Sequence, residues 1–159
     1  MAGYADSRTL IKTGDILIWE GTSILSWVIS KWTHSPYTHV GIAWVVGNRV
    51  LVLQADPGVG IDAAPLSKAL PVFWLPIPCA LTEEALGQAL DRLQESYSFM
   101  NAIRAGFGLR PRYKGFQCAQ YVNKVLRATG LRLHLPDLTP KSLVEVASVT
   151  FDQTPLKLT

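Results

Sequence analysis

Residues 39–55, HVGIAWVVGNRVLVLQA, contain two runs rich in β-branched side chains on either side of Gly47-Asn48. A two-residue connection in which both residues tolerate positive φ favours a tight β-hairpin. In this hairpin residue 46 faces 49, residue 41 faces 54, and residue 39 faces 56. The side-chain period of two therefore places His39, Gln54 and Asp56 on one face of the sheet.

Shorter patterns on both sides of the hairpin predict the other elements. The predicted strands are 15–19, 39–46, 49–55 and 71–78, and the predicted helices are 23–32, 82–97, 116–129 and 139–148. Three prolines in 71–78 confine that strand to a sheet edge or shorten it. Because strands come mostly first and helices mostly after, without regular β-α-β alternation, we predict an α+β fold with an antiparallel sheet packed against helices.

The bulk composition limits the classes of protein. A length of 159 residues fits a single domain spanning residues 1–159, and 48% hydrophobic content argues against disorder. A net charge of +3 is too small to indicate a nucleic-acid partner. The N-terminus lacks the pattern of a secretory signal, and the apolar run 23–30 is too short to cross a bilayer. These features predict a soluble cytoplasmic protein, which would meet an external substrate after lysis or from a particle.

Cys118 lies at the start of the predicted helix 116–129. Helix N-terminal amides stabilise a thiolate, which is the nucleophilic form of cysteine. The dipole supplies only about 0.3–1 kcal/mol, while one pKa unit needs about 1.36 kcal/mol, so a reactive thiol here also needs a cationic neighbour. The alternative interpretation is a small buried hydrophobe, since the following helix positions are apolar. Cys79, without a helix start, is predicted to be structural.

The three histidines differ in their surroundings. His39 stands at a strand entrance beside a polar partner, an arrangement that fixes an imidazole's tautomer and orientation in a Cys-His-polar triad. The alternative for His39 is a satisfied histidine without function. His34 and His134 fall in predicted loops and are expected to be exposed. Neither the histidines nor the two cysteines have metal-ligand spacing, so no metal or other cofactor is predicted.

Four segments together resemble a known family. They are TGDILIW (13–19), YTHVGIAWVV (37–46), LVLQADPGVGI (51–61) and GFQCAQYVNKVL (115–126). The combination of THVGI with a helix-initial cysteine is similar to the NlpC/P60 superfamily of papain-like cysteine hydrolases. It is closest in pattern to the circularly permuted, YiiX/YaeF-like branch, in which the histidine precedes the cysteine. The resemblance covers about residues 13 to 130 and implies a permuted papain-like fold.

The resemblance also implies roles for individual residues. Cys118 matches the catalytic nucleophile, His39 the general base and Gln54 the third, polar position. Many members of the branch have Glu at this third position, so the amide is a departure: it can accept an imidazole N–H but stabilises an imidazolium less than a carboxylate would. Asp56 is the rival for orienting His39, and Tyr37 is a further polar candidate.

The implied activity is cofactor-free hydrolysis of an amide bond, with cell-wall (peptidoglycan) peptides as the first expectation. A lipid-directed acyl hydrolase or acyltransferase is the second, because the permuted branch and the amphipathic helix 23–32 are compatible with peripheral membrane contact. A non-catalytic binding module is the third, and a basic and aromatic loop ahead of Cys118 could then hold an anionic ligand. That loop contains Arg104, Arg110, Arg112 and Lys114 with Phe107 and Tyr113. The pattern does not indicate an oligomeric state.

Overall fold

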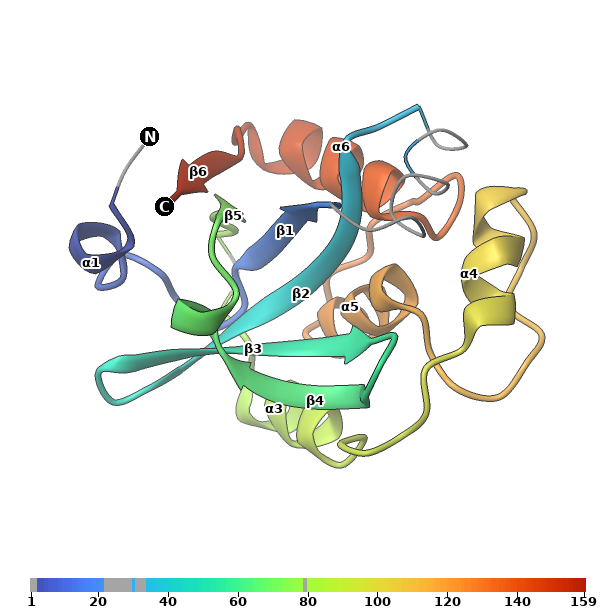
Figure 1. Cartoon of the computed structure of the whole chain (residues 1–159), viewed down its shortest axis with the longest axis horizontal. Helices are drawn as coiled ribbons and strands as arrows, with labels where there is room; N and C mark the ends of the chain where they lie inside the picture. The colour runs from blue at the N-terminus through green and yellow to red at the C-terminus, as the bar shows by residue number, and fades with distance from the viewer. Residues whose placement is uncertain (1–2, 22–29, 31–33, 79) are drawn as a thin grey trace.

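The computed structural model describes residues 3–21, 30, 34–78 and 80–159 (Figure 1). In these residues a six-stranded antiparallel sheet has the order β4-β3-β2-β1-β5-β6. The strands are β1 (Ile16–Glu20), β2 (Tyr37–Val46), β3 (Arg49–Asp56), β4 (Gly60–Pro65), β5 (Val72–Leu75) and β6 (Leu156–Leu158). The helices are α1 (Tyr4–Ser7), the 3-10 helix η1 (Leu66–Lys68), α3 (Glu83–Leu90), α4 (Phe99–Gly106), α5 (Cys118–Ala128) and α6 (Pro140–Phe151). The predicted α+β class with an antiparallel sheet is confirmed.

The hairpin of β2 and β3 has the predicted register. Val46 pairs with Arg49 and Gly41 pairs with Gln54, and Gly47 has a φ of 57°, as the tight connection requires. The ladder between the two strands ends at Gly41 and Gln54, so the predicted pair of residues 39 and 56 is not part of it. His39 is paired instead with Trp19 of β1. The histidine therefore stands where β2 has left β3.

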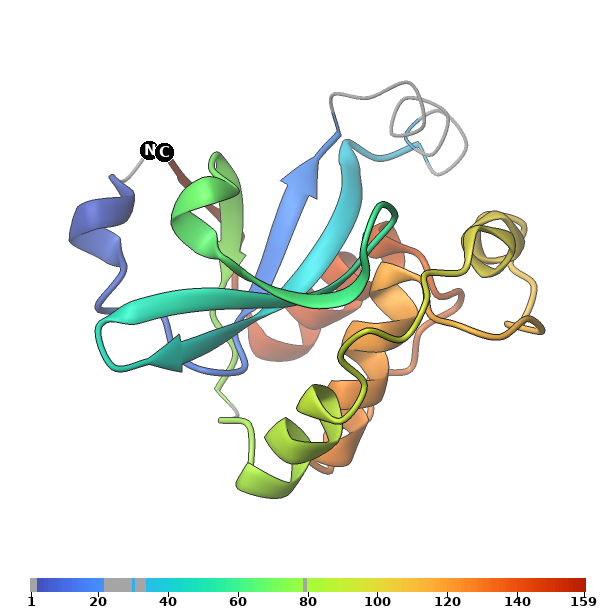
Figure 2. The same cartoon turned by 60° about the horizontal axis from the view of Figure 1, so that its bottom comes forward.

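Alternating side chains divide the sheet into two apolar faces. Val40, Ile42 and Leu53 belong to a core shared with α5 and α6, while Ala43 and Val52 belong to a smaller core on the other face. Figure 2 shows α3, α5 and α6 on one side of the curved sheet and α1 apart from them. The period of two along each strand accounts for this division, and it places α5 against β2.

The strand predicted at 71–78 is shorter and lies elsewhere in the sheet. β5 contains only Val72–Leu75, between Pro71 and Pro76, so the predicted shortening is confirmed. Of the two predicted outcomes, an edge position or a shortened strand, the structure has the second, since β5 pairs with β1 on one side and β6 on the other. Both prolines lie outside the paired residues, and the strand keeps the N–H donors that an inner position needs.

The helix predicted at 82–97 ends early. α3 stops at Leu90, Gln94 adopts a φ of 72°, and Tyr97 forms an isolated parallel bridge with Phe116. The prediction extended the helix to Tyr97 because this residue continues the apolar stripe. In the structure Tyr97 packs against the core from a non-helical segment. The other two helices are confirmed with shifted ends: one begins at Cys118, and the other continues to Phe151.

Several elements were not predicted from the sequence. These are α1, β4, η1, α4 and β6. The predicted helix 23–32 falls outside the described residues except for residue 30. Among the helices that the structure does describe, none is long and apolar enough to cross a membrane.

A buried carboxylate connects the start of β1 with the end of β5. Asp15 is 2% exposed, and its Oδ2 accepts hydrogen bonds from the Lys12 amide at 2.8 Å and the Trp74 indole at 2.7 Å. Its Oδ1 accepts from the Ile77 amide at 3.1 Å. Asp15 therefore satisfies two buried donors, the Trp74 indole and the Ile77 amide, together with the part-buried amide of Lys12.

Candidate active site

Cys118 is the first residue of α5, as the sequence indicated, and it is a free thiol with 3% of its surface exposed. Gln117 caps this helix: its Oε1 accepts from the Ala119 amide at 2.9 Å and lies 3.7 Å from the Cys118 sulfur. The amide group of Gln117 donates to the carbonyl of Leu138. These contacts fix the helix start and hold the thiol at the positive end of the dipole.

His39 lies between Cys118 and Gln54. Its Nε2 is 2.8 Å from the Gln54 Oε1, and its ring is in tilted contact with Trp19, with 5.3 Å between ring centroids. Since Nε2 donates to the Gln54 oxygen, Nδ1 is the ring nitrogen left to exchange a proton with the thiol. The structure thus brings together all three side chains that the sequence singled out.

The electrostatics of the pair favour charge separation. Burial alone would raise the pKa of the Cys118 thiol, but the charge of His39 and a hydrogen bond with it lower this pKa below its ordinary value. Hydrogen bonds with the backbone of Val40 and Ala119 lower it further. Burial would lower the pKa of His39, yet the facing thiolate and the Gln54 bond raise it. The cationic neighbour that a reactive Cys118 needs is therefore present.

Asp62 of β4 was missed by the sequence analysis. It is the Cα partner of Gln54, and a hydrogen bond from Gln54 opposes the burial that raises the pKa of its carboxyl. A carboxylate accepts hydrogen bonds only, so it must receive the NH₂ end of the Gln54 amide. This leaves the carbonyl end of Gln54 facing His39. The sequence held no signal for this contact because β4 was not predicted.

Asp56 and Tyr37, the other polar candidates from the sequence, make contacts elsewhere. The Asp56 carboxylate accepts from the Gly58 amide at 2.7 Å, in the turn between β3 and β4, while Gln54 takes the contact with His39. The Tyr37 ring packs edge-on against Phe73, with 5.9 Å between centroids. Tyr97, also missed, lies close enough to Cys118 for its pKa to be raised, first by burial and then by the thiolate charge. Tyr97 stays a neutral phenol beside the site.

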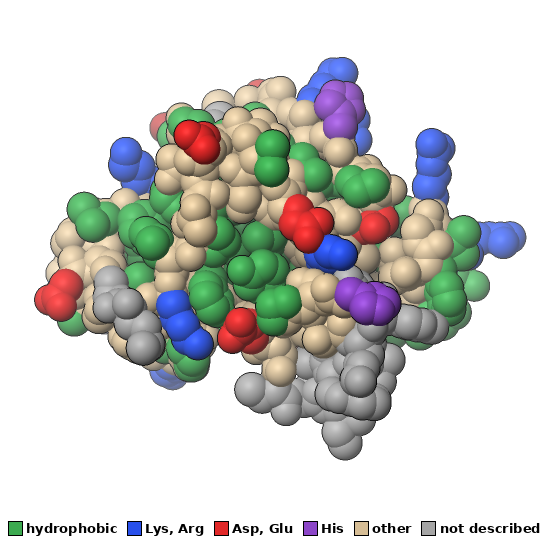
Figure 3. Space-filling model, turned by 90° about the horizontal axis from the view of Figure 1, so that it is seen from above, with side chains coloured by type: hydrophobic (Ala, Val, Ile, Leu, Met, Phe, Trp, Pro, Cys, Tyr) green, Lys and Arg blue, Asp and Glu red, His purple; other side chains and the backbone are tan. Residues whose placement is uncertain are grey.

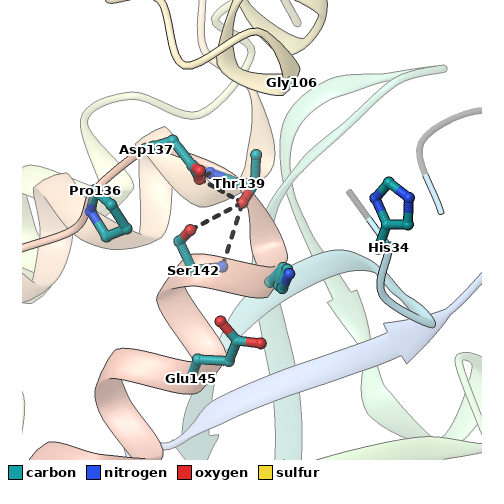
Figure 4. Close-up of a pocket in the computed structure, with 8 residues that line it drawn as sticks. His34, Gly106, Pro136, Asp137, Thr139, Ser142 and Glu145 are labelled. Atoms are coloured by element: carbon teal, nitrogen blue, oxygen red, sulfur yellow. Dashed lines mark hydrogen bonds between the residues drawn. The ribbon is translucent and has the colours of Figure 1, made fainter. Parts of the chain in front are cut away.

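His34 and His134 are exposed, as predicted. His34 borders a cavity of about 370 Å³ at the N-terminus of α6, across from Thr139 and Ser142 (Figure 4). The polar atoms on that side are engaged in helix capping: Thr139 Oγ1 accepts from the Ser142 amide at 3.2 Å and donates to Asp137 at 2.5 Å. These capping contacts account for the Thr139 and Ser142 side chains that border the cavity.

Comparison with known proteins supports the fold but gives no activity. No protein-family model matches the chain, and no curated protein matches it. Among solved structures, the crystal structure of the metalloprotein YiiX from Escherichia coli O157:H7 (DUF1105) is similar, with a TM-score of 0.59 and 22% identity. The match covers 77% of this chain and 69% of that one. The chain therefore has a YiiX-like fold.

The description of YiiX as a metalloprotein raises the question of a metal in this chain. Its described residues include no group of three His, Cys, Asp or Glu side chains that could hold a metal ion. The site itself offers one thiol and one imidazole, and its third member is an amide, which is a poor ligand for the metals that thiolates select. In the part of the chain that the structure describes, the residues around Cys118 therefore do not fit a bound metal.

The contact between His39 and Gln54 predicts a measurable shift. Gln54→Ala removes a hydrogen bond that stabilises the protonated imidazole, so the pKa of His39 should fall. Gln54→Glu should raise it, because a carboxylate stabilises an imidazolium more strongly. Titration of the histidine ring protons by NMR measures both changes. An unchanged pKa of His39 in both variants would refute the contact between His39 and Gln54.

Proposed function

We propose that this protein is a cysteine hydrolase related to the circularly permuted branch of the NlpC/P60 superfamily. The observation that carries the proposal is the alignment of Cys118, His39 and Gln54, with the imidazole in contact with both the thiol and the amide. The similarity to YiiX supports the fold part of the proposal. An amide or peptide bond, first of all in cell-wall peptides, is the proposed substrate.

The proposed reaction is acyl transfer through a thioester. Nδ1 of His39 takes the thiol proton, and the Cys118 sulfur attacks the substrate carbonyl carbon. Amides of the first turn of α5 stabilise the developing oxyanion. The tetrahedral intermediate collapses, the C–N bond breaks, and His39 returns its proton to the leaving amine. Water, deprotonated by His39, then cleaves the thioester and regenerates the thiol with release of the acid.

The pH dependence of Cys118 alkylation tests the proposal directly. At pH 6 an unperturbed thiol with a pKa near 8.5 is only about 0.3% ionised. We expect wild-type Cys118 to react with iodoacetamide at least about tenfold faster at pH 6 than Cys118 of His39→Ala, because the imidazolium stabilises the thiolate. The difference should shrink as the pH rises, because the thiol of His39→Ala then ionises as well. Peptide mapping by mass spectrometry separates Cys118 from Cys79, which serves as the internal reference.

Two results would contradict the proposal that this protein is a cysteine hydrolase. One is a Cys118 profile that superimposes on that of Cys79. The other is a Cys118 that stays unreactive in both proteins. Either result would favour a binding module that keeps the fold without the reaction.

A lipid-directed acyl hydrolase is the second candidate function. The same thiol chemistry would then act on an ester or amide of a lipid acyl chain. One observation favours it: the segment that leads into Cys118 presents large apolar side chains to solvent among basic ones. Release of free fatty acid, compared with release of amines from purified cell wall, separates the two candidates.

A further inference from the structure

Residues 98–115, named here the α4 segment, leave the body of the protein and return next to the active site. The segment starts after Tyr97 and ends before Phe116, and these two residues form a bridge two positions from Cys118. The Ser98 amide donates to the Phe116 carbonyl at 2.8 Å, and the Phe116 amide donates to the Ser96 carbonyl at 3.2 Å. Figures 1 and 2 show α4 standing away from the sheet.

Hydrogen bonds inside the α4 segment fix its conformation. Asn101 at its centre is fully buried, and its Oδ1 accepts from the amides of Arg112 and Tyr113, both at 3.0 Å. Its Nδ2 donates to the carbonyls of Tyr113 at 2.9 Å and Gly115 at 3.2 Å. One side chain thereby ties the helix to the returning loop, so the outer surface of the segment is held in place.

That outer surface is apolar. Phe99, Met100 and Ile103 follow helical spacing on the side opposite the buried Asn101 and Ala105. Six large hydrophobic side chains of the segment are between 44% and 57% exposed: Phe99, Met100, Ile103, Phe107, Leu109 and Tyr113. Contiguous exposed apolar surface of this kind usually marks an interaction site.

The α4 segment also carries the excess of positive over negative charge in the chain. It contains four of the fifteen Lys and Arg residues and none of the twelve Asp and Glu residues, so the remaining chain has a slight excess of negative charge. Arg110, Arg112 and Lys114 are exposed. In Figure 3 hydrophobic and basic side chains gather at the end of the molecule where Figure 1 draws α4. We call these six apolar and four basic residues (Arg104, Arg110, Arg112, Lys114) the α4 patch.

A polar cavity adjoins the patch. It has a volume of about 690 Å³ and lies between the loop after α4 and the outer side of α5. Arg110, Arg127 and His134 line it, against a single carboxylate, Asp137. An anionic headgroup would find cationic partners there while its acyl chains meet the apolar side chains.

We propose that the α4 patch docks this protein onto an anionic lipid bilayer surface. Exposed apolar side chains together with Lys and Arg are the composition that binds in the interfacial region of anionic membranes. The exposed apolar area selects a bilayer over a hydrophilic polyanion, which would leave Ile103 and Phe107 in water. The docking does not depend on hydrolysis, so a failure of the docking proposal and a failure of the proposed function can be told apart.

Vesicle co-sedimentation tests the docking. The protein carries Cys118→Ala, so lipid turnover cannot contribute, and the vesicles are phosphatidylcholine alone or with about a quarter phosphatidylglycerol. We expect binding to the anionic vesicles at low ionic strength and little binding to the neutral ones. The double variant Arg110→Gln/Arg112→Gln should bind about 30-fold more weakly, since each cation near the surface contributes about 1 kcal/mol. Ile103→Ser/Phe107→Ser should lose at least about tenfold.

Matched variants elsewhere on the surface serve as controls. Val149→Ser removes an apolar side chain that is 85% exposed on α6, and Arg49→Gln/Arg132→Gln removes two exposed charges. Neither control should change binding by more than about twofold at the same salt if the α4 patch is the contact. Circular dichroism confirms that each variant is folded.

Three outcomes would overturn the proposal. The first is no binding to the anionic vesicles at low ionic strength. The second is equal losses in the control and patch variants, which would mean that net charge alone drives adsorption. The third is heparin binding as tight as vesicle binding and unaffected by Ile103→Ser/Phe107→Ser, which would identify a general polyanion surface.

Discussion

If the proposed hydrolysis runs through the Cys118 thiolate, replacing Cys118 with alanine should lower kcat/KM by at least about 10³-fold, because the variant has no nucleophile. His39→Ala should cost nearly as much, because in the proposed reaction the imidazole both removes the thiol proton and returns it to the leaving group. The double variant Cys118→Ala/His39→Ala should be no worse than Cys118→Ala alone, since residues that act as one unit are not additive. Release of amino groups from purified cell wall and of fatty acid from phospholipid vesicles measures the loss for either candidate substrate.

The matched control for the cysteine is Cys79→Ala, which removes the other thiol of the chain. It should retain wild-type activity. Full activity in Cys118→Ala would show that the hydrolysis belongs to another site or to a contaminant. Losses in the single variants that simply multiply in the double variant would show that Cys118 and His39 do not work as one unit.

The parts of the site that the sequence predicted depend on local signals. Gly47-Asn48 fixes the hairpin register, and the register brings Gln54 to the side of His39. A helix start after Gly115 is also local, and it placed Cys118 at the head of α5. The contact between His39 and Cys118 is not local, and it came from the resemblance to a family and not from the pattern of residues.

The parts that were missed depend on pairing between distant segments. β4 has the sequence GIDAAP, which lacks the β-branched run of a strand, and its pairing with β3 makes it one. Only the pairing of β4 with β3 brings Asp62 next to Gln54. Tyr97 looked like part of a helical stripe, yet its bridge with Phe116 sets it beside Cys118. Tertiary pairing overrode propensity at both positions.

Asp15→Ala should destabilise the fold by about 3–5 kcal/mol, because the Trp74 indole and the Ile77 amide lose their acceptor in a buried position and the part-buried Lys12 amide loses its acceptor as well. For a chain of this length the melting temperature should fall by about 10 °C. Thermal and urea unfolding measure the change. Asp6→Ala, which removes an exposed carboxylate from α1, is the control and should change stability by less than about 0.5 kcal/mol.

The pH dependence of this loss has a definite sign. Burial raises the pKa of Asp15 above its ordinary value, against the lowering effect of its three hydrogen bonds. The folded protein therefore binds the Asp15 proton more tightly than the unfolded chain, and this contribution to stability is lost as the pH rises through the folded pKa. The difference in unfolding free energy between wild type and Asp15→Ala should widen as the pH falls from 7 towards 4. A difference that narrows over this range would mean that the hydrogen bonds, and not burial, dominate the ionisation of Asp15.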